Sequence, residues 1–196
     1  MFARTERLLL RPSWPEDAQE IYRAIADEGI VRNLARAPWP YTAEDAARYA
    51  GQDHDPRHPS FLLMLRTNGA PRLIGACGIG KLDGDAELGY WIARPYWGLG
   101  FATEASRAVV HIAKAIGHKK LIAGHFTDNP SSAKVLRKLG FQKTGKMVAR
   151  HSVGRGEAVD CAVYEKSLED SVSEHVAMPR TPAFSIREQF ERLQAA

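Results

Sequence analysis

The first half of the chain contains apolar runs of strand length, separated by turn residues. Runs rich in leucine, isoleucine and aromatic residues are typical of buried strands. Asn68-Gly69 between two of these runs is a strong hairpin signal, and Asp83-Gly84-Asp85 predicts a second turn. The pattern therefore predicts strands in hairpin connection, at residues 6–11, 61–66, 72–80 and 87–92.

Helical patterns occur on both sides of the fourth run. Ser13 and Glu16 have the spacing of a capping box, which predicts a helix with Ser13 as its N-cap, and Thr42 predicts the start of a second short helix. In the second half, helical and strand patterns alternate. Helices are predicted at residues 101–116 and 129–139, and strands at 121–127, 141–150 and 158–167.

Residues 171–196 differ from this pattern and are assigned to a C-terminal extension of a domain at residues 1–170. A short amphipathic helix is predicted near the end of the extension, and a helix of that length is marginal in water by itself. We therefore expect it to dock on its own domain or on a second subunit, with disorder as the alternative. Its apolar face consists of Ile186, Phe190 and Leu193.

A glycine-containing loop joins the fourth strand to the helix that begins at Phe101. Small residues let backbone N–H groups approach an anion closely, and a helix start adds unpaired donors and the positive end of the helix dipole. The loop therefore predicts a phosphate-binding turn and a phosphorylated ligand; the alternative is a tight connection without a ligand. It reads Trp97-Gly98-Leu99-Gly100-Phe101-Ala102-Thr103.

Two common phosphate-binding loops do not fit these residues. A P-loop ends in glycine, lysine and serine or threonine, whereas Phe101 and Ala102 follow Gly100. A dinucleotide fingerprint needs a third glycine where Thr103 stands, and an acidic residue about 20 positions further on, for which Asp128 comes too late. The acetyl-CoA loop of acetyltransferases is a third class, and the rest of the chain supports it.

Composition changes this picture little. The chain has 196 residues, of which 44% are apolar and 26% charged, as in an ordinary globular domain. A net charge of +4 suits a polyanionic cofactor and does not by itself indicate nucleic acid.

Cys77 and Cys161 lie in strand patterns, so we expect buried, reduced thiols. No apolar run has transmembrane length and the start is unlike a signal peptide, so a cytoplasmic location is expected.

His54 and His58 are four residues apart, a spacing that would suit a metal ion on a helix. Pro56 and Pro59 forbid a helix there, and no third ligand is near in the sequence. We therefore expect no metal site.

Two motifs in a fixed order give the chain its resemblance to a known family. The first is Glu87–Ile92 with the loop at residues 96–105, and the second is Asn129-Pro130-Ser131-Ser132 with Leu139-Gly140-Phe141. Over roughly residues 4–168, the chain resembles the GNAT N-acetyltransferases, in particular the RimJ/RimL-like ribosomal-protein-alanine acetyltransferase branch. Two motifs in the right order are far more specific than either alone.

The resemblance implies an α/β fold with a mixed, mostly antiparallel sheet of about seven strands, splayed at its centre and flanked by about four helices. It implies that acetyl-CoA binds in the gap as the acetyl donor, with its pyrophosphate on the loop amides and its pantetheine arm on Asn129. Lys134, Arg137 or Lys138 would meet the 3′-phosphate, unless these residues form a solvated helix face. The implied cofactor-binding residues are Trp97, Gly98, Leu99, Gly100, Phe101, Ala102, Thr103, Asn129, Ser132 and Lys134.

The chemistry needs an acceptor amine that has lost its proton and a donor that stabilises the thiolate leaving group. The resemblance implies Glu87 as the base, with a structural carboxylate as the alternative. Many family members have a tyrosine seven residues after the asparagine for the thiolate, but this chain has Leu136 there. Ser132 fills the role proposed for the RimJ/RimL-like branch, although it could instead cap the helix.

These interpretations predict an acetyl-CoA-dependent N-acetyltransferase that transfers acetyl directly to a primary amine. The acceptor could be a protein N-terminal α-amine. The alternatives are a small-molecule amine and a non-catalytic acyl-CoA-binding module on the same fold. Loops such as residues 32–41 and 151–156 would select the acceptor. No membrane and no specific nucleic acid is expected as a partner, and a homodimer is left open.

Overall fold

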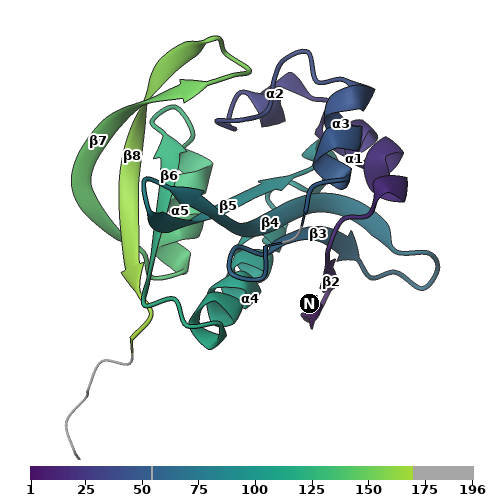
Figure 1. The fold of residues 1–196 in the computed structure, drawn as a ribbon, viewed down its shortest axis with the longest axis horizontal. Helices are drawn as coiled ribbons and strands as arrows, with labels where there is room; N and C mark the ends of the chain where they lie inside the picture. Colours follow the sequence, from purple (N-terminus) through teal and green to yellow (C-terminus); the bar gives the residue numbers. More distant parts are fainter. Residues whose placement is uncertain (54, 170–196) are drawn as a thin grey trace, which may run out of the picture.

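The computed structural model describes residues 1–53 and 55–169, which form a mixed eight-stranded sheet with helices on both faces (Figure 1). The strand order is β1-β2-β3-β4-β5-β6-β8-β7. The predicted C-terminal helix lies outside the described residues, so the division at residue 170 stays a prediction. The strands are β1 (Ala3–Arg4), β2 (Leu8–Arg11), β3 (Ser60–Leu65), β4 (Arg72–Leu82), β5 (Asp85–Ile92), β6 (Lys120–Phe126), β7 (Gln142–Ser152) and β8 (Glu157–Ser167).

Five α-helices accompany the sheet in the described residues, and the chain runs through α1 to α3 before it reaches β3. The helices are α1 (Ala18–Ile25), α2 (Glu28–Val31), α3 (Ala43–Ala50), α4 (Phe101–Ala115) and α5 (Pro130–Lys138), with short 3-10 turns at Pro15–Asp17 and Arg94–Tyr96. The strands and the long helices match the predicted elements closely. The two-residue β1 and the one-turn α2 are additions.

The sheet is splayed at its centre, as the family resemblance implies. β5 and β6 are parallel neighbours that are paired at Glu87 and Ile122, and β5 continues for five more residues beyond that pair. The strands on either side pair antiparallel. The backbone of β5 therefore faces a gap from Leu88 onward, at the carboxyl ends of two parallel strands.

The caps that position the helices are mostly those that the sequence predicts. The hydroxyl of Thr42 accepts a hydrogen bond from the Asp45 N–H at 3.1 Å, which confirms the cap of α3. The prediction that Ser13 caps the first helical turn is wrong: Trp14 is the cap residue, and the Asp17 carboxylate accepts from its N–H at 2.8 Å. The reason is that Arg11 binds Asp17 through both guanidinium nitrogens and holds the turn one residue further on.

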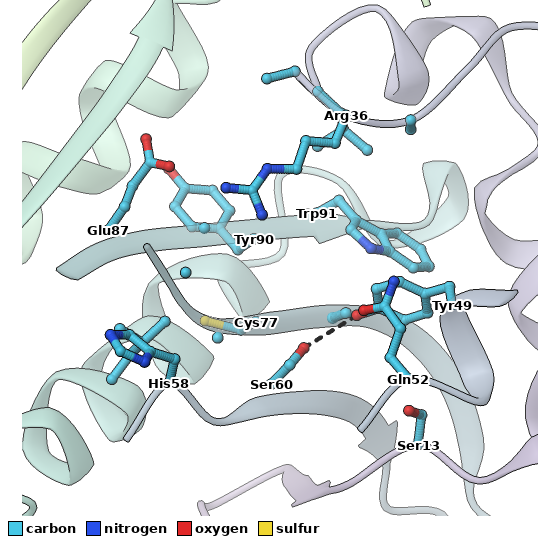
Figure 2. Close-up of a pocket in the computed structure, with 18 of the residues that line it drawn as sticks. Ser13, Arg36, Tyr49, Gln52, His58, Ser60, Cys77, Glu87, Tyr90 and Trp91 are labelled. Atoms are coloured by element: carbon cyan, nitrogen blue, oxygen red, sulfur yellow. Dashed lines mark hydrogen bonds between the residues drawn. The ribbon is translucent and has the colours of Figure 1, made fainter. Parts of the chain in front are cut away.

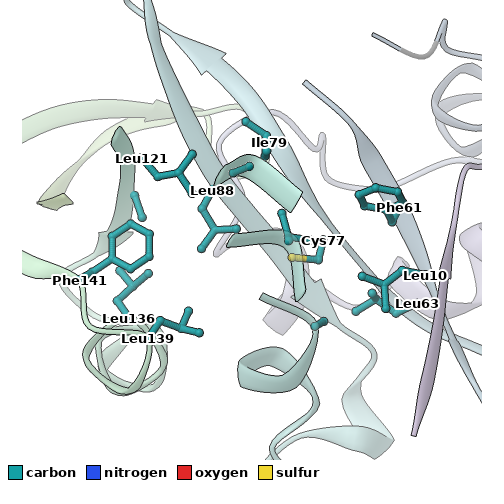
Figure 3. Packing of buried hydrophobic residues seen from close by; sticks show 14 of the residues in the cluster. Leu10, Phe61, Leu63, Cys77, Ile79, Leu88, Leu121, Leu136, Leu139 and Phe141 are labelled. Carbon is teal, nitrogen blue, oxygen red and sulfur yellow. The ribbon is translucent and has the colours of Figure 1, made fainter. Parts of the chain in front are cut away.

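Two apolar clusters cover opposite faces of the sheet. One lies between the sheet and helices α4 and α5, and the other between the sheet and helices α1 to α3. Side chains alternate along β5, so Leu88 and Ile92 belong to the first cluster while Trp91 belongs to the second. Figure 3 shows the first cluster, in which Leu136 and Phe141 from the α5 region meet the side chains of the sheet.

Two further observations concern the cysteines and the length of the helices. Cys77 and Cys161 are free and buried, as predicted. In the part of the chain that the structure describes, no helix is long and apolar enough to cross a membrane.

Candidate active site

Two cavities meet at the point where β5 and β6 diverge. The first, of about 640 Å³, lies over the face of the sheet that carries α3, and Figure 2 shows it. The second, of about 540 Å³, lies between β5, the start of α4, the end of β6 and α5. Both cavities are lined by Glu87, Gly89, Tyr90, Trp91 and Arg150. A reaction between a ligand in one cavity and a ligand in the other would take place at these residues.

Glycine keeps the junction of the cavities open. A Cβ atom added to Gly89 would meet no heavy atom within 4 Å, so any side chain there would project into the free space in front of β5. The first cavity has an aromatic and hydroxyl-bearing wall, where the hydroxyls of Tyr49 and Ser60 lie 3.2 Å apart (Figure 2). Arg36 reaches over it from the loop after α2 and donates to the carbonyl of Lys81 at 3.1 Å. This cavity can hold an organic molecule of modest size.

The glycine loop lines the second cavity as expected for a phosphate-binding turn. Gly98 and Gly100 have φ angles of 75° and 84°, which favour glycine, and Gly100 is the N-cap of α4. A Cβ at Gly98 would meet nothing within 4 Å, so an anion can approach the backbone closely. Six of the seven predicted loop residues line this cavity. Leu99 does not: its side chain is exposed, and its carbonyl accepts from Arg7 at 3.0 Å.

The N-terminal segment fixes this loop through an acidic residue in the first turn of α4. The carboxylate of Glu104 accepts from the Thr5 hydroxyl at 2.6 Å and from the backbone N–H of Arg7 at 2.9 Å, and the Arg7 guanidinium also binds it. Burial alone would raise the pKa of Glu104, but these hydrogen bonds outweigh it and hold the pKa below its ordinary value. Because Arg7 neutralises the carboxylate, Glu104 does not cancel the attraction of the helix N-terminus for phosphate.

The start of α5 forms the opposite wall of the second cavity. The side-chain oxygen of Asn129 accepts from the Ser132 N–H at 3.2 Å, so Asn129 is the cap of α5 and its amide nitrogen remains available to a ligand. Lys134 and Lys138 also line the cavity, and both are exposed. The second cavity therefore combines helix N-termini, positive φ glycines and lysines, a donor set that fits a phosphorylated cofactor.

Ser132 does not use its hydroxyl to cap the helix. Its oxygen lies 2.7 Å from the phenol oxygen of Tyr90, which projects from β5 across the gap. Burial raises the pKa of Tyr90 to about 12, against the opposing effect of this hydrogen bond. Leu136, at the position where many family members have tyrosine, is buried in the apolar core. The hydroxyl of Tyr90 thus comes from a different element, and the sequence interpretation missed it.

Glu87 forms an ion pair with an arginine on β7, the strand at the edge of the sheet. Both oxygens of its carboxylate are bound by the guanidinium of Arg150 on β7, one of them at 2.9 Å. The two side chains are 11% and 20% exposed. The hydrogen bond to Glu87 raises the pKa of Arg150, although burial opposes it. Glu87 therefore lies at the junction of the cavities, inside an ion pair that the sequence interpretation missed.

The tip of the β7–β8 hairpin lies beside the loop after α2 (Figure 1), and hydrogen bonds join the two. The Val153 N–H donates to the Ala35 carbonyl at 3.0 Å, and the Ser152 hydroxyl donates to the Leu34 carbonyl at the same distance. Arg155 binds both oxygens of Asp128, at 2.8 and 3.0 Å. The contacts of Val153 and Ser152 join the two loops that we expected to select the acceptor, residues 32–41 and 151–156.

Comparisons with known proteins agree with this geometry. A family model described as "Acetyltransferase (GNAT) domain" matches residues 7–142. The uncharacterized N-acetyltransferase p20 of Bacillus licheniformis is 29% identical over 171 residues, which cover 84% of this chain and 93% of the relative. The microcin C7 self-immunity acetyltransferase MccE, solved with acetyl-CoA and AMP, has a TM-score of 0.69 at 19% identity over 83% of this chain and 93% of its own. RimL, a ribosomal L7/L12 α-N-protein acetyltransferase solved with coenzyme A, has a TM-score of 0.69 at 15% identity. The match covers 85% of this chain and 98% of RimL.

The chain belongs to the GNAT acetyltransferase family. It is an N-acetyltransferase, and acetyl-CoA is its acetyl donor. The fold is the mixed, splayed sheet that the sequence resemblance implies.

Proposed function

We propose that the chain transfers acetyl directly from acetyl-CoA to a primary amine, with the cofactor in the second cavity and the amine in the first. The observation that carries this proposal is the junction at Glu87, Gly89 and Tyr90, where the two cavities meet in the gap of the sheet. Acetyl-CoA supplies the activated acetyl group, and the chain supplies a site in which an amine can meet it from the other side.

Transfer without an acyl-enzyme is favoured by the state of the two cysteines. Burial raises the pKa of Cys77 to about 12, and burial also raises the pKa of Cys161. A thiol needs its thiolate form to act as a nucleophile, and both residues are therefore poor candidates at neutral pH.

The residue roles follow from position. Glu87 accepts a proton from the acceptor amine, directly or through water, and Arg150 binds both oxygens of the carboxylate and fixes its orientation. Asn129 holds the pantetheine arm, the backbone at residues 98–103 holds the pyrophosphate, and Lys134 meets the 3′-phosphate. Glu87→Gln should lower turnover while the Kd for acetyl-CoA stays near that of the wild type. Full turnover in this variant across the pH range would make Glu87 structural.

Two acceptor classes fit the first cavity. The RimJ/RimL-like motifs favour the α-amine of a protein N-terminus. The volume of about 640 Å³ favours a small-molecule amine, or the first residues of a polypeptide that enters from the α3 side.

A screen of thiol release distinguishes these acceptors. The full chain would be incubated with acetyl-CoA and, separately, with small amines and with peptides of varied N-terminal residue. Turnover on peptides with a free α-amine, lost when the amine is blocked, would support the protein N-terminal acceptor. Binding of acetyl-CoA without turnover on any amine would refute the proposal of direct transfer and favour a non-catalytic acyl-CoA-binding module.

A further inference from the structure

We propose that Tyr90 and Ser132 form a single hydrogen-bond-donating unit that stabilises the coenzyme A thiolate as it leaves. The inference rests on the proposed function, in which direct transfer breaks the thioester at the junction of the two cavities. It adds a residue from β5 to a role that the sequence motifs assign to Ser132 alone.

The first argument is the path by which the two hydroxyls meet. Tyr90 lies beyond the pair Glu87–Ile122, where β6 has already diverged from β5. Its side chain is therefore free to cross the gap to the first turn of α5, 42 residues further along the chain, where its phenol oxygen comes within 2.7 Å of the Ser132 hydroxyl. Both residues line the second cavity, and Tyr90 also lines the first.

The second argument is a count of hydrogen atoms. Two hydroxyl groups carry two hydrogens, and the bond between their oxygens uses one of them. Asn129 already satisfies the backbone N–H of Ser132, so the Ser132 hydroxyl is not needed for capping. The phenol oxygen also lies 3.4 Å from the Ser132 carbonyl, which can accept its hydrogen. When the phenol donates to the Ser132 hydroxyl instead, the hydrogen of Ser132 is left for a ligand in the cavity.

The third argument is that the phenol stays protonated, as a hydrogen-bond donor must. A phenol is also a stronger hydrogen-bond donor than an alkyl hydroxyl, so Tyr90 strengthens the pair. Burial keeps the phenol protonated throughout the range in which amines are acetylated, since its pKa lies near 12. The pair therefore carries both of its hydrogens when the thioester breaks.

The step balances without a further reagent. The acceptor nitrogen bonds to the acetyl carbon, and the carbon–sulfur bond breaks with its electron pair on sulfur. The nitrogen loses one proton, to Glu87 or to water, and the sulfur leaves as a thiolate that accepts a hydrogen bond from the hydroxyl pair. The pair keeps both of its hydrogens, and solvent protonates the thiolate after coenzyme A has left.

Tyr90→Phe is the first test, because it removes one hydroxyl and keeps the ring. With acetyl-CoA and an amine that the wild type acetylates, we expect kcat to fall about ten- to hundredfold while KM for acetyl-CoA changes by less than about twofold. Ser132→Ala should lose a similar factor, and the double variant should lose no more than either single one, because the two hydroxyls act as a unit. Ser132→Thr keeps the hydroxyl and should recover part of the loss.

Tyr22→Phe is the matched control. It makes the same chemical change on α1, and Tyr22 lines neither of the two cavities. Its kcat should equal that of the wild type.

A second measurement needs no acceptor. Donors aimed at the sulfur favour bound coenzyme A in its thiolate form, so calorimetric titration of the wild type with coenzyme A should release protons below the thiol pKa of roughly 8.5. Tyr90→Phe should reduce this release at least about threefold.

The outcomes separate the two proposals. If no amine is acetylated by the wild type but Tyr90→Phe still reduces proton release, direct transfer fails and the donor unit stands. The inference is overturned if Tyr90→Phe leaves kcat and proton release unchanged. It is also overturned if the losses in the two single variants multiply in the double variant, or if only KM and Kd rise.

Discussion

The ion pair of Glu87 with Arg150 offers the sharpest test of the structure, because it joins β5 to β7 through the centre of the site. Arg150→Met removes the guanidinium and leaves a carboxylate with 11% exposure and no ionic partner. Breaking a buried pair by removing one partner costs about 3–5 kcal/mol. The carboxylate faces an open cavity that admits water, so we expect the lower end, about 3 kcal/mol of the free energy of unfolding.

A loss of about 3 kcal/mol in a domain of this size lowers Tm by roughly 6–12 °C. The assay is urea unfolding of wild type, Arg150→Met, Glu87→Gln and the double variant, which together form a double-mutant cycle. Glu87→Gln should also destabilise the protein, because it leaves the guanidinium without a charged partner. The double variant should be more stable than the sum of the single losses implies, by at least about 1.5 kcal/mol.

Two results would refute this reasoning. Losses below about 0.5 kcal/mol in both single variants would mean that the pair contributes little in solution, as exposed pairs do. Additive losses would mean that each residue acts through other neighbours. Arg48→Met is a suitable control, because Arg48 is 72% exposed and pairs with Asp45 on the surface of α3, where we expect a loss within about 1 kcal/mol.

Three further predictions concern the cofactor and pH. Acetyl-CoA at about 100 times its Kd should stabilise the fold by roughly 2.7 kcal/mol and raise Tm by about 5–10 °C, and NAD should do little; a shift with NAD alone would contradict the loop assignment. Ala102→Glu should keep α4 intact, because acidic residues suit a helix start, yet weaken acetyl-CoA binding by at least about tenfold through repulsion of the pyrophosphate. Ala102→Gln is its neutral control, and equal binding of the two variants would place the phosphates elsewhere. The fold lowers the pKa of Glu104 from 4.5, so the stabilisation from its carboxylate is complete above that pH and is lost as pH falls through the pKa of the folded state. Glu104→Gln should therefore lose less stability than the wild type between about pH 5 and pH 3.

Ala102 suits the binding test better than Gly100 because the two residues differ in backbone conformation. Replacing Gly100 by valine would crowd the phosphates, but the φ angle of 84° would also strain a β-branched residue. Loss of binding in that variant would then have two causes. Ala102 has a helical backbone, so its replacement changes the charge of the site without this strain.

The sequence by itself determined the elements, because their signals are local. The helical spacing of apolar residues, with glycine or asparagine at each end, placed α4 between Gly100 and Gly117, and α5 between Asn129 and Gly140. The glycine loop identified the cofactor class, because its chemistry depends on adjacent backbone amides. Ser13 shows the limit of such signals, since the local capping pattern was overruled by the contact of Arg11 with Asp17.

The partners in the site were decided by the tertiary structure alone. Arg150 is 63 residues from Glu87, and the strand order β5-β6-β8-β7 puts two strands between them in the sheet. Nothing in the residues around Arg150 marks it as facing the site, because its role depends on the curvature of β7 over the gap. Tyr90 belongs to the motif at residues 87–92, yet its contact with Ser132 depends on the divergence of β6 from β5. Strand order and splay arise from packing over the whole domain, and local pattern along the chain does not encode them.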